Sequence, residues 1–191
     1  MRESIKITPQ LADCDSESLN DELEQETRLF TEALKSYEAE VPKKYQTGVD
    51  IDRPHSIGDV VSQIDSALKE YKNESERTVW EAVRKSFWRL SESQDALKNW
   101  MALLPSESEY MSIICGGLNL IIKAAGRIGD VRNEAFRALA ELPFHLENTR
   151  ESVGIFSKSD ALRKCGVRLY TVTLDTLGHI LKWFKKKAIG M

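Results

Sequence analysis

The feature that most constrains the fold is the apolar run from Met111 to Ala125, which lies within the segment EYMSIICGGLNLIIKAAGR. Its only charged side chain is Lys123 and its only amide is Asn119. A helix that spans a membrane needs about 20 consecutive apolar residues, so this run is too short. We therefore expect it to be the buried central helix of a bundle.

Two adjacent glycines, Gly116 and Gly117, stand in the middle of this run. A phosphate-binding loop of the form GxxxxGK[ST] requires a glycine before the lysine and a serine or threonine after it. Neither residue is present around Lys123, so we do not expect a nucleotide there. Each glycine costs about 1 kcal/mol of helix propensity relative to alanine. We therefore predict that the pair is a close-packing point, where a neighbouring helix approaches the backbone.

Apolar residues recur at helical spacing along most of the chain, and no convincing strand appears. The segment Ser56-Ile-Gly-Asp59 resembles a capping box and predicts a helix start. The sequence predicts an all-α helical bundle of about five to six helices, with a four-helix-bundle core and long central helices. The helices are expected over residues 20–40, 56–71, 74–104, 107–126, 129–148 and 159–187. Residues 1–19 are predicted to be an acidic, flexible N-terminal segment, and residues 20–191 a single domain.

Charge is distributed unevenly along the chain. Residues 1–50 contain 6 basic and 12 acidic residues, whereas residues 151–191 contain 8 basic and 3 acidic residues. The net charges are therefore −6 and +5. Such asymmetry indicates either that the two ends pair with each other or that a basic terminus binds an anionic partner.

The basic residues concentrate in the last stretch, TLGHILKWFKKKAIGM, where they alternate with apolar and aromatic residues. A basic amphipathic helix of this kind fits an anionic membrane surface or an acidic partner. Lysines also suit any helix C-terminus, because they complement the helix dipole, and both interpretations stay open. Nucleic acid is not expected, since the chain is net acidic and has no recognisable nucleic-acid motif. The candidate contact residues are Lys182, Trp183, Phe184, Lys185, Lys186 and Lys187.

No pattern in the sequence indicates catalysis, a metal or a cofactor. The histidines are far apart and show no HExxH spacing, and no GxSxG elbow is present. The three cysteines fit no zinc pattern. Cys115 and Cys165 lie in apolar helical patterns and are expected to be buried free thiols. Because these motifs are missing, we expect a non-enzymatic protein. The N-terminus has no signal-peptide core, so we expect the protein to be cytoplasmic.

Two segments resemble a known family. LFTEALKSYEAE (residues 29–40) resembles the opening helix of the fungal STAND N-terminal "Goodbye" domain. That helix reads aromatic-x-x-Ala-hydrophobic-x-x-Tyr, and the matching positions here are Phe30, Ala33, Leu34 and Tyr37. ALLPSESEYMSIICGGLNLIIKAA (residues 102–125) resembles the Pro-then-Gly helix of these domains and of their relatives at the N-termini of fungal NACHT proteins. The resemblance covers residues 27–187.

The resemblance implies the N-terminal signalling or effector module of a fungal NOD-like receptor, distantly similar to HeLo-type bundles. Such a module precedes a nucleotide-binding oligomerisation domain, in the same chain or in a partner chain, and self-associates. It is expected to act in regulated cell death or innate immunity, with the basic last helix engaging anionic membrane lipid on activation. The acidic, polar residues 1–19 depart from the apolar N-terminus of HeLo-type proteins and argue against N-terminal membrane insertion. The alternative is a non-enzymatic protein–protein interaction scaffold without a membrane step.

Overall fold

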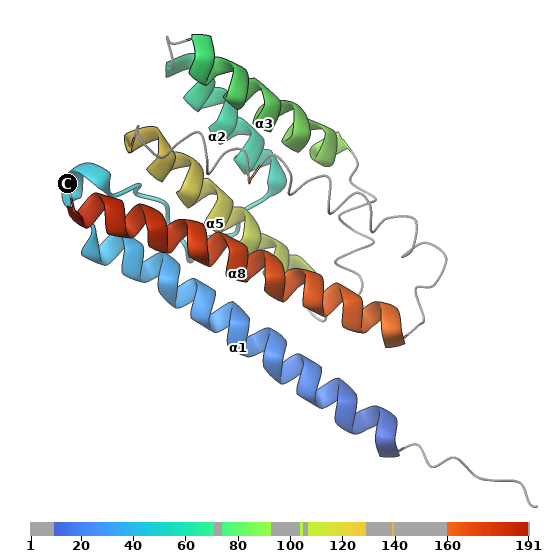
Figure 1. Cartoon of the computed structure of the whole chain (residues 1–191). Coiled ribbons are helices and arrows are strands. Elements are labelled where there is room, and N and C mark those ends of the chain that lie inside the picture. The colour runs from blue at the N-terminus through green and yellow to red at the C-terminus, as the bar shows by residue number, and fades with distance from the viewer. Residues whose placement is uncertain are drawn as a thin grey trace, which may run out of the picture.

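The computed structural model describes residues 10–70, 74–92, 104, 107–128, 139 and 160–190. Within these residues all regular structure is helical and no strand occurs, which confirms the predicted all-α helical bundle (Figure 1). The described elements are α1 (Gln10–Glu40), the short 3₁₀ helix η1 (Lys43–Tyr45), α2 (Ile57–Glu70), α3 (Glu74–Glu92), α5 (Glu107–Arg127) and α8 (Asp160–Gly190).

The first and last helices lie side by side and run in the same direction (Figure 1). Near the middle of α1, the hydroxyls of Thr27 and Tyr170 are 3.2 Å apart. At its end, Glu40 forms an ion pair with Lys185 at 2.8 Å. Residue numbers therefore increase together along both helices, which identifies a parallel pair.

The contact face of α8 has the heptad period of a coiled coil. Its buried apolar residues follow alternating steps of three and four: Val167, Tyr170, Leu174, Leu177, Leu181, Phe184 and Ala188. Thr27 is a polar member of the facing stripe on α1, and its hydroxyl donates to the Leu23 carbonyl at 2.7 Å. The Tyr170 hydroxyl must therefore donate to Thr27. A shift in the register of the two helices would break this hydrogen bond within an apolar seam. The bond between Thr27 and Tyr170 therefore favours one alignment.

The charges of the two helices are opposite. α1 contains two basic and ten acidic residues, a net charge of −8, and α8 contains seven basic and two acidic residues, a net charge of +5. Parallel packing places like ends of the helix dipoles together, which is unfavourable. The opposite charges offset this cost. The acidic first helix therefore pairs with the basic last helix of the same chain, which is the first of the two explanations for the charge asymmetry.

Helix α5 occupies the centre and contacts α1, α2, α8 and η1. Every residue from Ile114 to Ile122 is buried, as are Ala124 and Ala125. A helix buried on all faces must be apolar all round, which is what the run from Met111 to Ala125 provides. The prediction of a buried central helix is confirmed. In the part of the chain that the structure describes, no helix has the length and hydropathy needed to cross a membrane.

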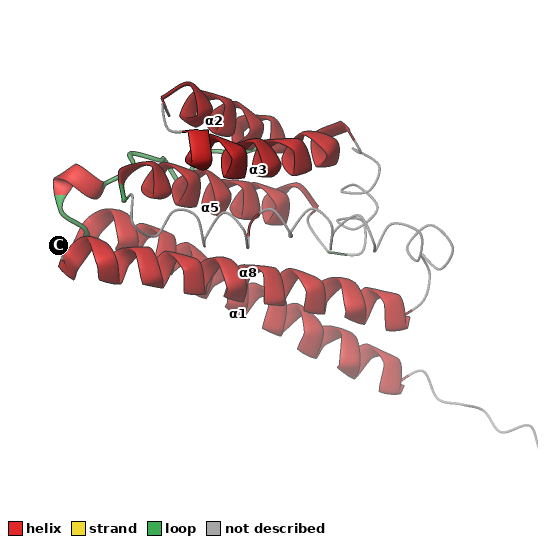
Figure 2. Ribbon diagram, turned by 45° about the horizontal axis from the view of Figure 1, so that its top comes forward, coloured by secondary structure: helices red, strands yellow, loops and turns green. Residues whose placement is uncertain are grey.

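Helices α2 and α3 form a second layer over α5 (Figure 2). The predicted capping box opens α2: the Ser56 N–H donates to Asp59 Oδ2 at 2.8 Å, and the Asp59 N–H donates to Ser56 Oγ at 3.2 Å. Hydrogen bonds from Ser56 hold the pKa of the Asp59 carboxyl below its usual value. The cap therefore satisfies two backbone donors at the start of α2 reciprocally.

One predicted boundary needs correction, and another is described only in part. Helix α1 begins at Gln10, so residues 10–19, which were predicted to be flexible, are helical. Extending an existing helix is far easier than nucleating one, and acidic residues suit a helix N-terminus. The helix predicted over residues 74–104 is described only to Glu92, and Leu104 is buried but not helical. Residues 93–103 and nearly all of the predicted helix 129–148 lie outside the described residues.

Candidate functional site

Helix α5 runs in the same direction as α1 and α8, so the C-terminal ends of the three helices lie at one end of the bundle (Figure 1). The ion pair between Glu40 and Lys185 joins the ends of α1 and α8. Arg127, at the end of α5, acts electrostatically on Tyr37 of α1. Cationic residues of η1 and of the last turns of α5 and α8 lie at this end, and we call this group the basic end: Lys43, Lys44, Arg127, Lys185, Lys186 and Lys187.

The positive charge of the basic end exceeds what the helix ends require. Each helix C-terminus carries roughly −0.5 charge, so three of them contribute about −1.5. Glu38 and Glu40 add two carboxylates in the last turn of α1. The six positive charges of the basic end exceed the sum of these negative charges, which is about −3.5. Dipole compensation alone therefore does not account for the group.

The structure separates the six residues predicted on the last helix into two groups. Phe184 is fully buried in the core, and the partly buried Trp183 packs beside it with ring centroids 5.6 Å apart. Lys185 pairs with Glu40 and also donates to Ser36 Oγ at 2.7 Å. Hydrogen bonds from Lys185 and Ser36 keep the pKa of Glu40 below its usual value. These three predicted residues therefore serve the bundle itself.

The other three predicted lysines are exposed. Lys186 and Lys187 lie in the last turns of α8, and Lys182 lies one turn before them. Ile189, which was not predicted, is 56% exposed beside them. This arrangement differs from the predicted amphipathic surface, because the aromatic face of α8 is turned into the bundle. What remains accessible is a lysine surface with one exposed isoleucine.

The glycine pair of α5 accommodates side chains from other elements. A Cβ at Gly117 would lie 2.5 Å from Cζ of Phe30, and a Cβ at Gly116 would lie 2.9 Å from Cδ2 of His55. The close packing predicted here is therefore made by inserted aromatic and imidazole rings. At Gly117 the predicted approach of a neighbouring helix is confirmed, because Phe30 belongs to α1, whereas at Gly116 the inserted ring comes from the loop before α2.

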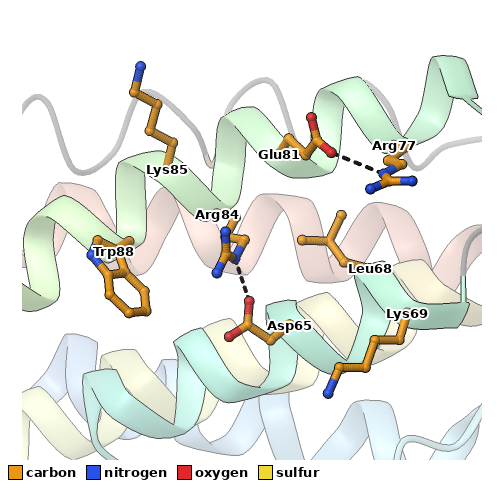
Figure 3. A pocket seen from close by; sticks show the side chains of 8 residues that line it. All are labelled: Asp65, Leu68, Lys69, Arg77, Glu81, Arg84, Lys85 and Trp88. Atoms are coloured by element: carbon orange, nitrogen blue, oxygen red, sulfur yellow. Dashed lines mark hydrogen bonds and ion pairs between the residues drawn. The ribbon is translucent and has the colours of Figure 1, made fainter.

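A groove of about 960 Å³ lies between α2 and α3. Figure 3 shows Arg84 of α3 reaching across to Asp65 of α2, at 2.5 Å. Arg77 pairs with Glu81 at 3.0 Å along α3. Trp88, which is 46% exposed, lies with its ring centroid 5.6 Å from the Arg84 guanidinium. Tryptophan and arginine are enriched at protein interfaces, so this groove suits a protein contact.

The described side chains offer little for metal binding or for thiol chemistry. No group of three or more histidine, cysteine, aspartate or glutamate side chains among them could hold a metal ion. Burial raises the pKa of the Cys115 thiol to about 12, so it is unreactive at neutral pH. Cys165 is exposed, contrary to the prediction. Cys165 lies two residues before Val167, which places it on the opposite side of α8 from the contact stripe.

The fold and surfaces define an all-α helical bundle with an exposed basic end. No family model, curated protein or solved structure matches the chain. The family resemblance of residues 29–40 and 102–125 therefore stays a prediction.

Proposed function

We propose that the chain is a non-enzymatic signalling module of the kind found at the N-terminus of fungal NOD-like receptors. In this proposal it acts in regulated cell death or innate immunity through oligomerisation, and it docks on an anionic membrane surface. The observation that supports the docking step is the exposed lysine surface at the end of α8, with Lys182, Lys186 and Lys187 beside the exposed Ile189.

The charge of this surface is sufficient for peripheral binding. Each lysine near an anionic membrane contributes about 1 kcal/mol. With Lys43 and Lys44, which are also exposed, five lysines would contribute about 5 kcal/mol. Such binding is screened by salt and weakens at high ionic strength. Phe184 and Lys185 keep their partners in the bundle, so α8 docks without leaving it.

Co-sedimentation with vesicles tests this docking. Wild type is expected to bind vesicles that contain phosphatidylserine at low salt and to bind pure phosphatidylcholine vesicles much less. The test variant removes three exposed charges by glutamine substitution at Lys182, Lys186 and Lys187. The control variant makes the same charge change away from the basic end, at Lys69, Lys85 and Lys164. Absence of wild-type binding to anionic vesicles, or an equal loss in both variants, contradicts the proposal.

A second candidate is a protein–protein interaction scaffold without a membrane step. The exposed Trp88 in the groove between α2 and α3 favours it. If the groove mediates self-association, light scattering will show an oligomer at high concentration, and Trp88→Ala will shift it to monomer. A wild-type chain that stays monomeric contradicts self-association in both candidate functions.

A further inference from the structure

A polar cavity of about 490 Å³ lies between the loop that precedes α2, α2 itself and α5. In Figure 1 this loop runs from the end of α1 to the start of α2. The chemically important residues of its lining are Asp50, Arg53, His55, Asp59, Asn119 and Lys123. Among the described residues of the lining, Val49 is the only aliphatic side chain, so this part of the cavity offers little surface to an apolar ligand.

Asn119, which belongs to the lining of this cavity, carries a buried and unpaired acceptor. His55 Nε2 lies 2.8 Å from the Asp50 carbonyl, which only accepts, so Nε2 carries the proton and donates. His55 Nδ1 is then an acceptor, and it lies 3.3 Å from Asn119 Nδ2. This contact fixes the amide orientation. Asn119 is 5% exposed, and among the described residues its Oδ1 has no hydrogen-bond partner.

An unpaired buried acceptor costs about 1–3 kcal/mol and calls for an explanation.

The wall of the cavity is held in place by specific contacts. The Glu38 carboxylate accepts the backbone N–H groups of Thr47 at 2.9 Å and of Gly48 at 3.2 Å. Gly48 has φ of 67°, a conformation that favours glycine. Gly116 leaves room for the His55 ring. Such preorganisation lowers the cost of binding a ligand.

We propose that this cavity binds a small zwitterion of the amino-acid class. Its lining pairs two cations, Arg53 and Lys123, with two carboxylates, Asp50 and Asp59. A zwitterion matches this balance, whereas a simple anion or cation would not. The ligand carboxylate meets Lys123 and Arg53, and its ammonium donates to Asn119 Oδ1 and to the Asp50 carboxylate. The polar lining selects a polar side chain.

This inference is independent of the proposed function, because it uses none of the residues of the basic end. Isothermal titration calorimetry of the chain with L-serine, L-asparagine, L-glutamine and L-arginine tests it. We expect saturable one-to-one binding of at least one of these probes. For that probe, the N-acetyl derivative and the α-carboxamide should each bind at least tenfold more weakly, since each lacks one of the two charges.

Surface variants keep the test independent of folding. Lys123→Gln and Arg53→Gln should each weaken binding at least tenfold, whereas Lys69→Gln, outside the cavity, should leave it unchanged. Absence of saturable binding by all four amino acids overturns the proposal. So does equal binding of the N-acetyl derivative. If Asn119→Leu stabilises the chain and no amino acid binds wild type, the Asn119 oxygen serves only a buried water.

Discussion

The ring of Phe30 lies between two glycines, which predicts opposite effects for the same substitution. Phe30 of α1 is 4% exposed. A Cβ at Gly117 of α5 would lie 2.5 Å from Cζ and 2.7 Å from Cε1 of this ring. A Cβ at Gly178 of α8 would lie 3.8 Å from Cδ2, an ordinary van der Waals distance. Alanine therefore forces a rearrangement at Gly117 but only adds a contact at Gly178.

The magnitudes follow from two opposing terms. Both substitutions gain about 1 kcal/mol of helix propensity. Gly178→Ala should therefore stabilise the bundle by roughly 0.5–1 kcal/mol. At Gly117 an overpacking cost of about 1–3 kcal/mol opposes the gain. The same Cβ would also lie 3.8 Å from Leu34 Cδ2, an ordinary van der Waals distance that adds no further cost. The two variants should thus differ by about 1–3 kcal/mol.

Urea denaturation followed by circular dichroism measures this difference. Gly178→Ala should raise the transition midpoint relative to wild type, and Gly117→Ala should not. Gly117→Leu should lower the midpoint further. If Gly117→Ala is as stable as Gly178→Ala, the Phe30 ring is not confined at Gly117 and the reasoning is refuted.

A double-mutant cycle identifies the cause of the penalty. Phe30→Leu removes the aromatic atoms that the new Cβ would meet. In that background Gly117→Ala should lose its overpacking cost and retain only the propensity gain. A penalty of the same size in both backgrounds would mean that the cost of Gly117→Ala arises elsewhere, because residues that do not interact have additive effects.

Three further predictions concern the α2 cap and the thiols. Ser56→Ala should destabilise the bundle by about 1 kcal/mol in urea denaturation, and an unchanged midpoint would count against the reciprocal cap. The folded pKa of Asp59 is below the ordinary value of 3.8, so its contribution is present above that value and is lost as the pH falls through the folded pKa. The difference in melting temperature between wild type and Asp59→Ala should therefore shrink at acid pH, and a constant difference would contradict this. Iodoacetamide should modify Cys165 in the native protein and Cys115 only after unfolding, as peptide mass mapping will show; rapid native labelling of Cys115 would contradict its burial.

Features encoded by local sequence could be predicted. Pro42 places the end of α1, which the structure has at Glu40. The Ser56–Asp59 spacing predicted a cap because both partners lie in one helical turn. The bounds of α5 also agree with the prediction to within one residue, since an apolar run flanked by charges leaves little freedom.

Features that depend on distant contacts were not specified by the sequence, although the opposite charges of the two chain ends left their pairing open as one of two explanations. The parallel pairing of α1 with α8 joins residues more than 140 positions apart, such as Thr27 and Tyr170. The cavity beside His55 combines a loop with the face of a helix that follows 64 residues later, at Asn119. The only local signals for it were an amide within an apolar run and the glycine beside the inserted ring. Neither signal specifies a partner.

In the proposed membrane docking, the packing of α8 against the bundle decides whether this helix stays in place or is released. Releasing the end of α8 would expose Leu177, Leu181 and Phe184, which are buried in the bundle. Exposing each of them costs about 1.5–3 kcal/mol, so release costs roughly 5–9 kcal/mol before any lipid contact. The exposed lysines contribute about 5 kcal/mol at an anionic surface whether or not the helix is released. Because docking of the intact bundle obtains this contribution without the cost, surface binding is favoured over insertion of α8.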